Sequence, residues 1–95
     1  MKEAKVEDYF VDRIKALGGL QRKAGWIGRR DAPDRVAMGI PNHPLGPTIW
    51  VELKRPGETP RTSQLREHER MRAAGQIVLV IDSIELVDHH FPLPK

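Results

Sequence analysis

Apolar residues recur every three or four positions near the N-terminus, at Val6, Phe10, Ile14 and Leu17. This spacing places side chains along one face of an α-helix. Two glycines, Gly18 and Gly19, then interrupt the pattern, and glycine commonly ends a helix. The sequence therefore predicts a helix over residues 2–17 with one apolar face.

A carboxylate interrupts this apolar face. Glu7 lies three residues before Phe10 and seven before Ile14, which places it on or beside the buried side of the helix. It could reach water from the margin of the face, or pair with Lys54 or an arginine. Alternatively, it belongs to a functional site, as a metal ligand or as a group that orients one.

The clearest strand pattern spans residues 48–54, where two sets of side chains alternate. A strand directs alternate side chains to opposite faces. The apolar set consists of Ile49, Val51 and Leu53. Glu52 and Lys54 are therefore expected to project together from the other face.

Shorter patterns predict the elements around this strand. Residues 20–27 and 35–38 have the composition of strands. Residues 39–47 contain two glycines and three prolines, so a loop is expected there, and it would connect the second and third strands as a hairpin.

A second helix is predicted over residues 64–74. Thr62 or Thr59 is the expected N-cap, and Gly75 follows as the C-terminal stop. Residues 76–81 then form a strand that is apolar on both faces, which predicts that it is covered on both sides and lies inside the sheet. The helix would thus be a parallel crossover between two strands.

The C-terminal part carries weaker signals. Residues 82–88 predict a short helical turn, and residues 89–95 an irregular tail. The tail contains Phe91 and Leu93, which are large apolar groups with little reason to be exposed in a monomer.

Chain length and composition limit the possible architectures. The 95 residues allow one domain over positions 1–95 with a modest core. The absence of cysteine excludes disulfides and thiolate zinc sites and favours a reducing cytoplasm. No secretory segment and no apolar stretch of bilayer length is present, so no membrane association is expected.

The net charge is +3, and the basic residues occur in clusters. Such clusters suit a polyanion, although an ordinary solvated surface with a mild basic excess would look similar. The clusters contain Arg22, Lys23, Arg29, Arg30 and Arg35, and then Lys54, Arg55, Arg61, Arg66, Arg70 and Arg72.

Two short motifs combine carboxylates with a cation. Pro33 and Asp34 precede one predicted strand, and Glu52-Leu53-Lys54 ends the next. Two carboxylates that converge beside an ammonium group are the components of a metal-assisted phosphodiester hydrolase. Alternatively, Asp34 caps a turn while Glu52 and Lys54 form a surface pair, which would contribute well under about 1 kcal/mol.

The histidines and tryptophans are expected to be peripheral to this chemistry. His43 lies in the loop 39–47, which is expected to face the cleft of the site, and His68 lies one helical turn after Gln64. Histidines in such positions are usually surface groups, but His68 shares the helix face of Gln64. Trp26 and Trp50 could stack on bases, although packing against the sheet is favoured.

In this combination the chain resembles the stand-alone virus-type replication-repair nuclease (VRR-NUC) domain of the PD-(D/E)XK nuclease superfamily, a form found in phages and bacteria. The resemblance covers residues 7–81 and follows the order of the family's motifs. These are Glu7, Lys23, the run from Gly28 to Arg35, the run from Trp50 to Lys54, Gln64 and Gly75.

The resemblance implies a fold and a metal site. The fold would be a restriction-endonuclease-like α/β structure with an α-β-β-β-α-β core, in which helices flank a mixed sheet. Asp34 and Glu52 would bind Mg²⁺ or Mn²⁺ with the Leu53 carbonyl, and such hard cations prefer oxygen ligands. Lys54 would position or activate the attacking water.

Two further residues match site positions of the family. Glu7 would lie near a possible second metal ion, and Gln64 would orient the catalytic strand or the scissile phosphate. The implied substrate is DNA, often branched or containing junctions, in phage or bacterial replication and repair. Nucleic-acid contacts are expected from Lys23, Arg29, Arg30, Arg35, Arg55 and Arg61.

Other functions and assemblies follow from the same features. The chain could be a catalytically idle DNA-binding module or a protein-interaction domain of a repair assembly. A homodimer is expected, because one subunit offers one site whereas duplex or junction DNA presents two strands. Its interface would use the loop 39–47 and the tail around Phe91 and Leu93, unless that tail is frayed. The expected location is the cytoplasm, that of a bacterial host if a phage encodes the protein.

Overall fold

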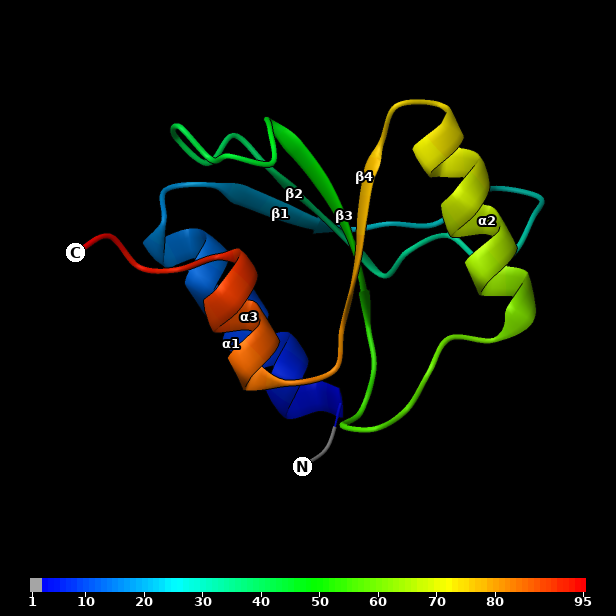
Figure 1. Cartoon of the computed structure of the whole chain (residues 1–95), viewed down its shortest axis with the longest axis horizontal. Coiled ribbons are helices and arrows are strands. Elements are labelled where there is room, and N and C mark those ends of the chain that lie inside the picture. Colours follow the sequence, from blue (N-terminus) through cyan, green and yellow to red (C-terminus); the bar gives the residue numbers. More distant parts are fainter. Residues whose placement is uncertain (1–2) are drawn as a thin grey trace.

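The computed structural model describes residues 3–95 and contains one mixed sheet between helices (Figure 1). This architecture is the predicted α/β core with an additional C-terminal helix. The elements in chain order are α1 (Glu3–Ala16), β1 (Leu20–Lys23), β2 (Arg35–Met38), β3 (Thr48–Leu53), α2 (Thr62–Ala73), β4 (Ile77–Ile81) and α3 (Ile84–His90).

The strands occur in the order β1-β2-β3-β4. β1 and β2 pair antiparallel, as do β2 and β3 across the loop 39–47, whereas β3 and β4 pair parallel through α2. Both the predicted hairpin and the predicted crossover are therefore confirmed.

The prediction that the strand at residues 76–81 lies inside the sheet is wrong, because β4 is an edge strand. Its apolar character has another cause. At β4, α2 lies on one side of the sheet and α1 and α3 lie on the other (Figure 1). Ile81 is opposite Leu53 in the core cluster that includes Val6 of α1, and Val78, three residues earlier and opposite Trp50, therefore faces the other side. Both side chains are buried, so helices cover both faces of a strand that has one neighbour.

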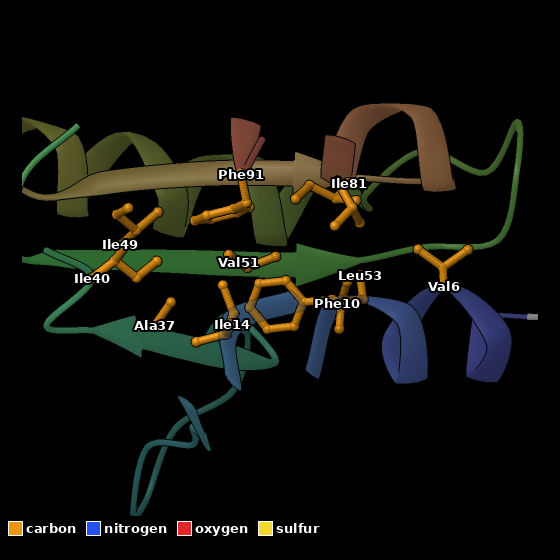
Figure 2. Packing of buried hydrophobic residues seen from close by; sticks show 11 residues of the cluster. Val6, Phe10, Ile14, Ala37, Ile40, Ile49, Val51, Leu53, Ile81 and Phe91 are labelled. Atoms are coloured by element: carbon orange, nitrogen blue, oxygen red, sulfur yellow. The ribbon is translucent and has the colours of Figure 1, made fainter. Parts of the chain in front are cut away.

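The core lies between α1 and the sheet (Figure 2). Val6, Phe10 and Ile14 are fully buried and pack against the apolar face of β3. This face consists of Ile49, Val51 and Leu53, each at most 1% exposed. The two sequence periodicities therefore predicted both sides of this interface.

The strand predicted over residues 20–27 ends at Lys23, and residues 24–34 form a loop. The side chain of Trp26, in this loop, donates its indole N–H to Glu67 of α2 at 2.7 Å. Within the loop Gly28 has φ 80°, which glycine adopts without the usual penalty for side chains. A tertiary contact thus shortens the strand.

The N-cap prediction of Thr62 or Thr59 is also wrong. The N-cap residue of α2 is Arg61, and its backbone N–H donates to the Gln64 side-chain oxygen at 2.9 Å. Gln64 thereby satisfies a backbone donor at the start of the helix, which otherwise has no partner within the helix.

The C-terminal segment is more ordered than the pattern indicated. α3 extends to His90, and Phe91 is fully buried, with its ring 5.7 Å from that of Phe10. Arg13 donates to the Phe91 carbonyl at 2.8 Å. Phe91 therefore belongs to the core of the monomer and is not available for a dimer interface.

A search of residues 3–95 for a transmembrane segment found no helix that is long and apolar enough to cross a bilayer.

Candidate active site

Glu52 and Lys54 form an ion pair at the end of β3. Glu52 is 1% exposed, and the Lys54 Nζ atom is 3.3 Å from Glu52 Oε2. The interpretation as a surface pair is therefore wrong. A buried carboxylate needs a compensating charge, because loss of hydration costs several kcal/mol per ion. Lys54 supplies that charge.

Asp34 joins this pair through the backbone of β3. Its Oδ2 atom accepts a hydrogen bond of 2.7 Å from the N–H of Leu53. The β2 ladder begins one residue later, at Arg35, so the side chain of Asp34 provides the acceptor at the margin of the paired region. The two predicted carboxylates are thus brought to the same strand end.

Gln64 contacts the same carboxylate from α2. Its Nε2 atom donates to Glu52 Oε2 at 2.9 Å, while its Oε1 atom accepts from Arg61. One amide therefore links the start of α2 to the end of β3. The role of Gln64 in orienting the catalytic strand or the scissile phosphate stays a prediction.

His68 is the site residue that the pattern assigned to the surface, and this was wrong. It is fully buried, and its Nε2 atom is 3.7 Å from Glu52 Oε1. Burial lowers the pKa of the His68 imidazole, as do the charges of Arg72 and Lys54, which outweigh the opposite effects of Glu67 and Asp34. This direction favours the neutral form of the ring. Its i+4 spacing from Gln64 was the sequence signal for this position.

Glu67 is a second buried carboxylate that the sequence did not reveal. It is 6% exposed and accepts hydrogen bonds from Trp26, Arg29 and Arg70. Burial raises the pKa of Glu67, but the hydrogen bonds from Arg70 and Trp26 and the nearby arginine charges outweigh this effect and keep it lowered. Glu67 anchors the loop that leads to Asp34.

Glu7 pairs with an arginine, which is one of the alternatives considered for it. Arg35 Nε is 3.0 Å from Glu7 Oε2, and Arg35 Nη1 donates to Gln21 at 2.6 Å. The Arg35 side chain is only 13% exposed. The guanidinium group of Arg35 therefore interacts with Glu7 and Gln21 inside the protein. The other basic residues proposed for DNA contacts are exposed: Lys23, Arg29, Arg30, Arg55 and Arg61.

His43 does not face the site. Its Nε2 atom is 2.8 Å from the His90 carbonyl, and its ring is 5.2 Å from that of Phe91. The loop 39–47 therefore packs against the C-terminal segment. Trp26 and Trp50 have ring centroids 5.6 Å apart, and both indole N–H groups are hydrogen-bonded within the protein, which agrees with packing.

The donor atoms fit a hard divalent cation. Asp34 and Glu52 contribute carboxylates, and the Leu53 carbonyl follows Glu52 directly in the chain, in the residue whose N–H donates to Asp34. Across residues 3–95, no group of three or more acidic, histidine or cysteine side chains is arranged to hold an ion, and Glu7 is paired with Arg35. Two carboxylates with a carbonyl and water match the coordination habits of Mg²⁺.

Comparisons with known proteins agree with this fold. Putative nuclease p44 of Acyrthosiphon pisum secondary endosymbiont phage 1 is 42% identical over 86 residues, which cover 90% of this chain and 88% of that relative. A solved structure described as a VRR_NUC domain superposes with a TM-score of 0.82 at 40% identity, covering 94% of this chain and 92% of the other. A scan against family models found no match.

The fold is that of the restriction-endonuclease-like α/β class. Within that class, the chain belongs to the VRR-NUC family. The family resemblance and the fold predicted from sequence are thereby confirmed.

Proposed function

We propose that this protein is a DNA endonuclease that depends on Mg²⁺ or Mn²⁺ and hydrolyses phosphodiester bonds. The observation that carries the proposal is the hydrogen bond from Leu53 N–H to Asp34, which places this carboxylate beside the buried Glu52 and Lys54 pair. The phage relative with 42% identity is named as a nuclease, which supports the same reaction.

Asp34, Glu52 and the Leu53 carbonyl would hold the divalent ion. When bound, such an ion stabilises charge on the phosphoryl oxygens and lowers the pKa of a water molecule. Lys54, whose side chain is 12% exposed, can orient the attacking water with its ammonium group. Gln64 holds Glu52 in place, and Glu7 acts through Arg35 or near a second ion.

The exposed cations supply the DNA contacts. Arg29 in the loop 24–34 is paired with Glu67 of α2, and Arg61 at the start of α2 is paired with Asp31 of the loop. Arg30 of the loop is exposed, as are Lys23 at the end of β1 and Arg55 after β3. A cation of this kind binds phosphates without reading sequence, which suits structure-dependent cleavage of branched DNA in phage or bacterial replication and repair, within a bacterial cytoplasm.

A panel of single-stranded, duplex, flap and four-way DNA tests this function. With Mg²⁺ or Mn²⁺ we expect cleavage, strongest on branched DNA, and none after removal of metal with EDTA. Without metal, the logarithm of the DNA-binding constant should fall linearly with the logarithm of the salt concentration. The slope should be about −0.9 for each phosphate that the protein contacts. Salt-sensitive binding without cleavage would identify an idle DNA-binding module, and the absence of both would favour a protein-interaction domain.

We also propose a symmetric homodimer, in which two sites address the two strands of the substrate. The loop 39–47 and the C-terminal tail together form an apolar hollow of about 310 Å³, next to which Leu93 is 53% exposed. This surface is the proposed contact with the second copy. Its lining consists of Leu17, Ile40, Pro41, Asn42, His43, Pro44, Pro92, Leu93 and Pro94.

Light scattering at micromolar concentration should give twice the 10.8 kDa mass of one chain. Removal of residues 92–95, which keeps Phe91 in the core, should give a monomer with little change in melting temperature. A wild-type protein that remains at 10.8 kDa would refute the dimer, and a truncated protein that remains dimeric would refute this interface.

A further inference from the structure

Two residues of one helix approach the two oxygens of a single carboxylate. Gln64 donates to Glu52 Oε2 at 2.9 Å, and His68 Nε2 is 3.7 Å from Glu52 Oε1. The residues are four positions apart in α2 and therefore project from the same helix face. The helix thus presents one polar group to each oxygen of Glu52.

The environment of His68 is unusual for a histidine that only fills space. The side chain is fully buried, and within residues 3–95 neither ring nitrogen has a hydrogen-bond partner. A neutral imidazole has one N–H donor and one acceptor nitrogen, and a buried donor without a partner destabilises the fold. An apolar side chain would avoid this loss of stability, so the presence of an imidazole indicates that His68 has a function other than filling space.

We propose that His68 is a positioning residue for Glu52: its Nε2–H donates to Oε1 and holds the carboxylate in the orientation that binds the divalent ion. This inference rests on the proposed metal-dependent function. An N–H···O bond requires about 2.7–3.2 Å, so the two atoms need to approach by about 0.5–1 Å from the observed distance of 3.7 Å.

The role follows from the geometry of the carboxylate. Gln64 and Lys54 both contact Oε2, whereas His68 Nε2 approaches Oε1. A donor at Oε1 fixes the plane of the carboxylate. Residues that orient a metal-binding carboxylate typically change metal affinity or activity by about 10–100-fold when they are replaced.

Calorimetric titration of the 95-residue protein with Mn²⁺ in the absence of DNA tests this role. His68→Leu should bind Mn²⁺ about 10–100-fold more weakly and melt no lower than wild type, because an unpartnered polar group is removed. His68→Gln, which can place an N–H near the position of Nε2, should recover most of the affinity. His89→Leu makes a comparable change at an exposed position and should match wild type.

A purely structural role predicts the opposite pattern. His68→Leu would then bind Mn²⁺ as wild type does, or His68→Gln would bind no better than His68→Leu, and either result would overturn the inference. If His68→Leu does not fold, the Mn²⁺ affinities of wild type and His68→Gln still test the inference. If His68→Gln loses as much Mn²⁺ affinity as Glu52→Gln does, the inference is also overturned.

The tautomer of His68 provides a readout that needs neither metal nor cleavage. Spectra of ¹⁵N-histidine-labelled protein should show His68 protonated at Nε2, with its resonance shifted by Glu52→Gln. His43 is an internal reference, because its Nε2 atom must donate to the His90 carbonyl while Nδ1 accepts from Leu45. A proton on Nδ1 of His68 would refute the inference.

Failure of the nuclease proposal would give a different result. If wild type cleaves no DNA but His68→Leu still weakens Mn²⁺ binding, the positioning role stands and the proposed activity fails. If wild type cleaves DNA while His68 carries its proton on Nδ1, the activity stands and the positioning role fails. Wild type that binds no Mn²⁺ would overturn the metal site together with this role.

Discussion

Asp34→Asn is expected to reduce metal-dependent DNA cleavage by about 10³-fold or more, equivalent to about 4 kcal/mol of lost transition-state stabilisation. Asparagine removes the charge that would bind the ion, whereas its side-chain oxygen can still accept from the Leu53 N–H. Melting temperature should therefore remain close to that of wild type. Single-turnover cleavage with Mg²⁺ and a thermal melt measure the two effects.

Asp34→Ala tests the same geometry through stability. It should be equally inactive, but it also leaves the Leu53 N–H without its acceptor, which costs about 1–3 kcal/mol. Glu52→Ala should likewise abolish cleavage, because no neighbour supplies its ligand oxygens. Glu69→Ala changes an exposed acid on α2 and is the control. Wild-type rates for Asp34→Ala, in protein free of contaminating nuclease, would show that the site is assigned incorrectly.

Lys54→Met is expected to lower the maximal cleavage rate by about 10²-fold or more while Mn²⁺ still binds. Methionine preserves most of the side-chain volume but removes the ammonium group that would orient the water. It also removes the charge that compensates the buried Glu52 at 3.3 Å, so the variant should melt lower than wild type. Single-turnover rates at saturating metal and calorimetry separate the two effects.

Metal should partly rescue the stability of this variant. A bound divalent ion restores positive charge beside Glu52, so saturating Mg²⁺ should raise the melting temperature of Lys54→Met more than that of wild type. Lys15→Met makes the same replacement at an exposed position of α1 and should change neither rate nor metal response. Loss of Mn²⁺ binding in Lys54→Met would instead indicate that the lysine organises the ligands.

Periodicity alone determined the elements that form the site. The alternation in residues 48–54 placed Glu52 and Lys54 on one face and the apolar set on the other, and the structure shows both arrangements. The helical spacing of Val6, Phe10 and Ile14 gave the opposing surface of the core. These patterns are reliable because each is set by the geometry of a single element and by which side excludes water.

Long-range pairing could not be determined in this way. Burial on both faces of β4 is caused by helices, so it does not distinguish a central strand from the observed edge strand. Similarly, the burial of Phe91 depends on the path of α3 over α1 and on contact with Phe10. A local pattern records that a side chain is buried but not which distant segment covers it.

The sequence by itself determined the fold class, the helical and strand faces, and the two carboxylates with their lysine. Only the tertiary structure decided that Glu7 pairs with Arg35, that Glu67 anchors the loop before Asp34, and that His68 lies beside Glu52. The physical reason is that a polar side chain is buried only when distant partners compensate its lost hydration, and those partners are assembled by the fold.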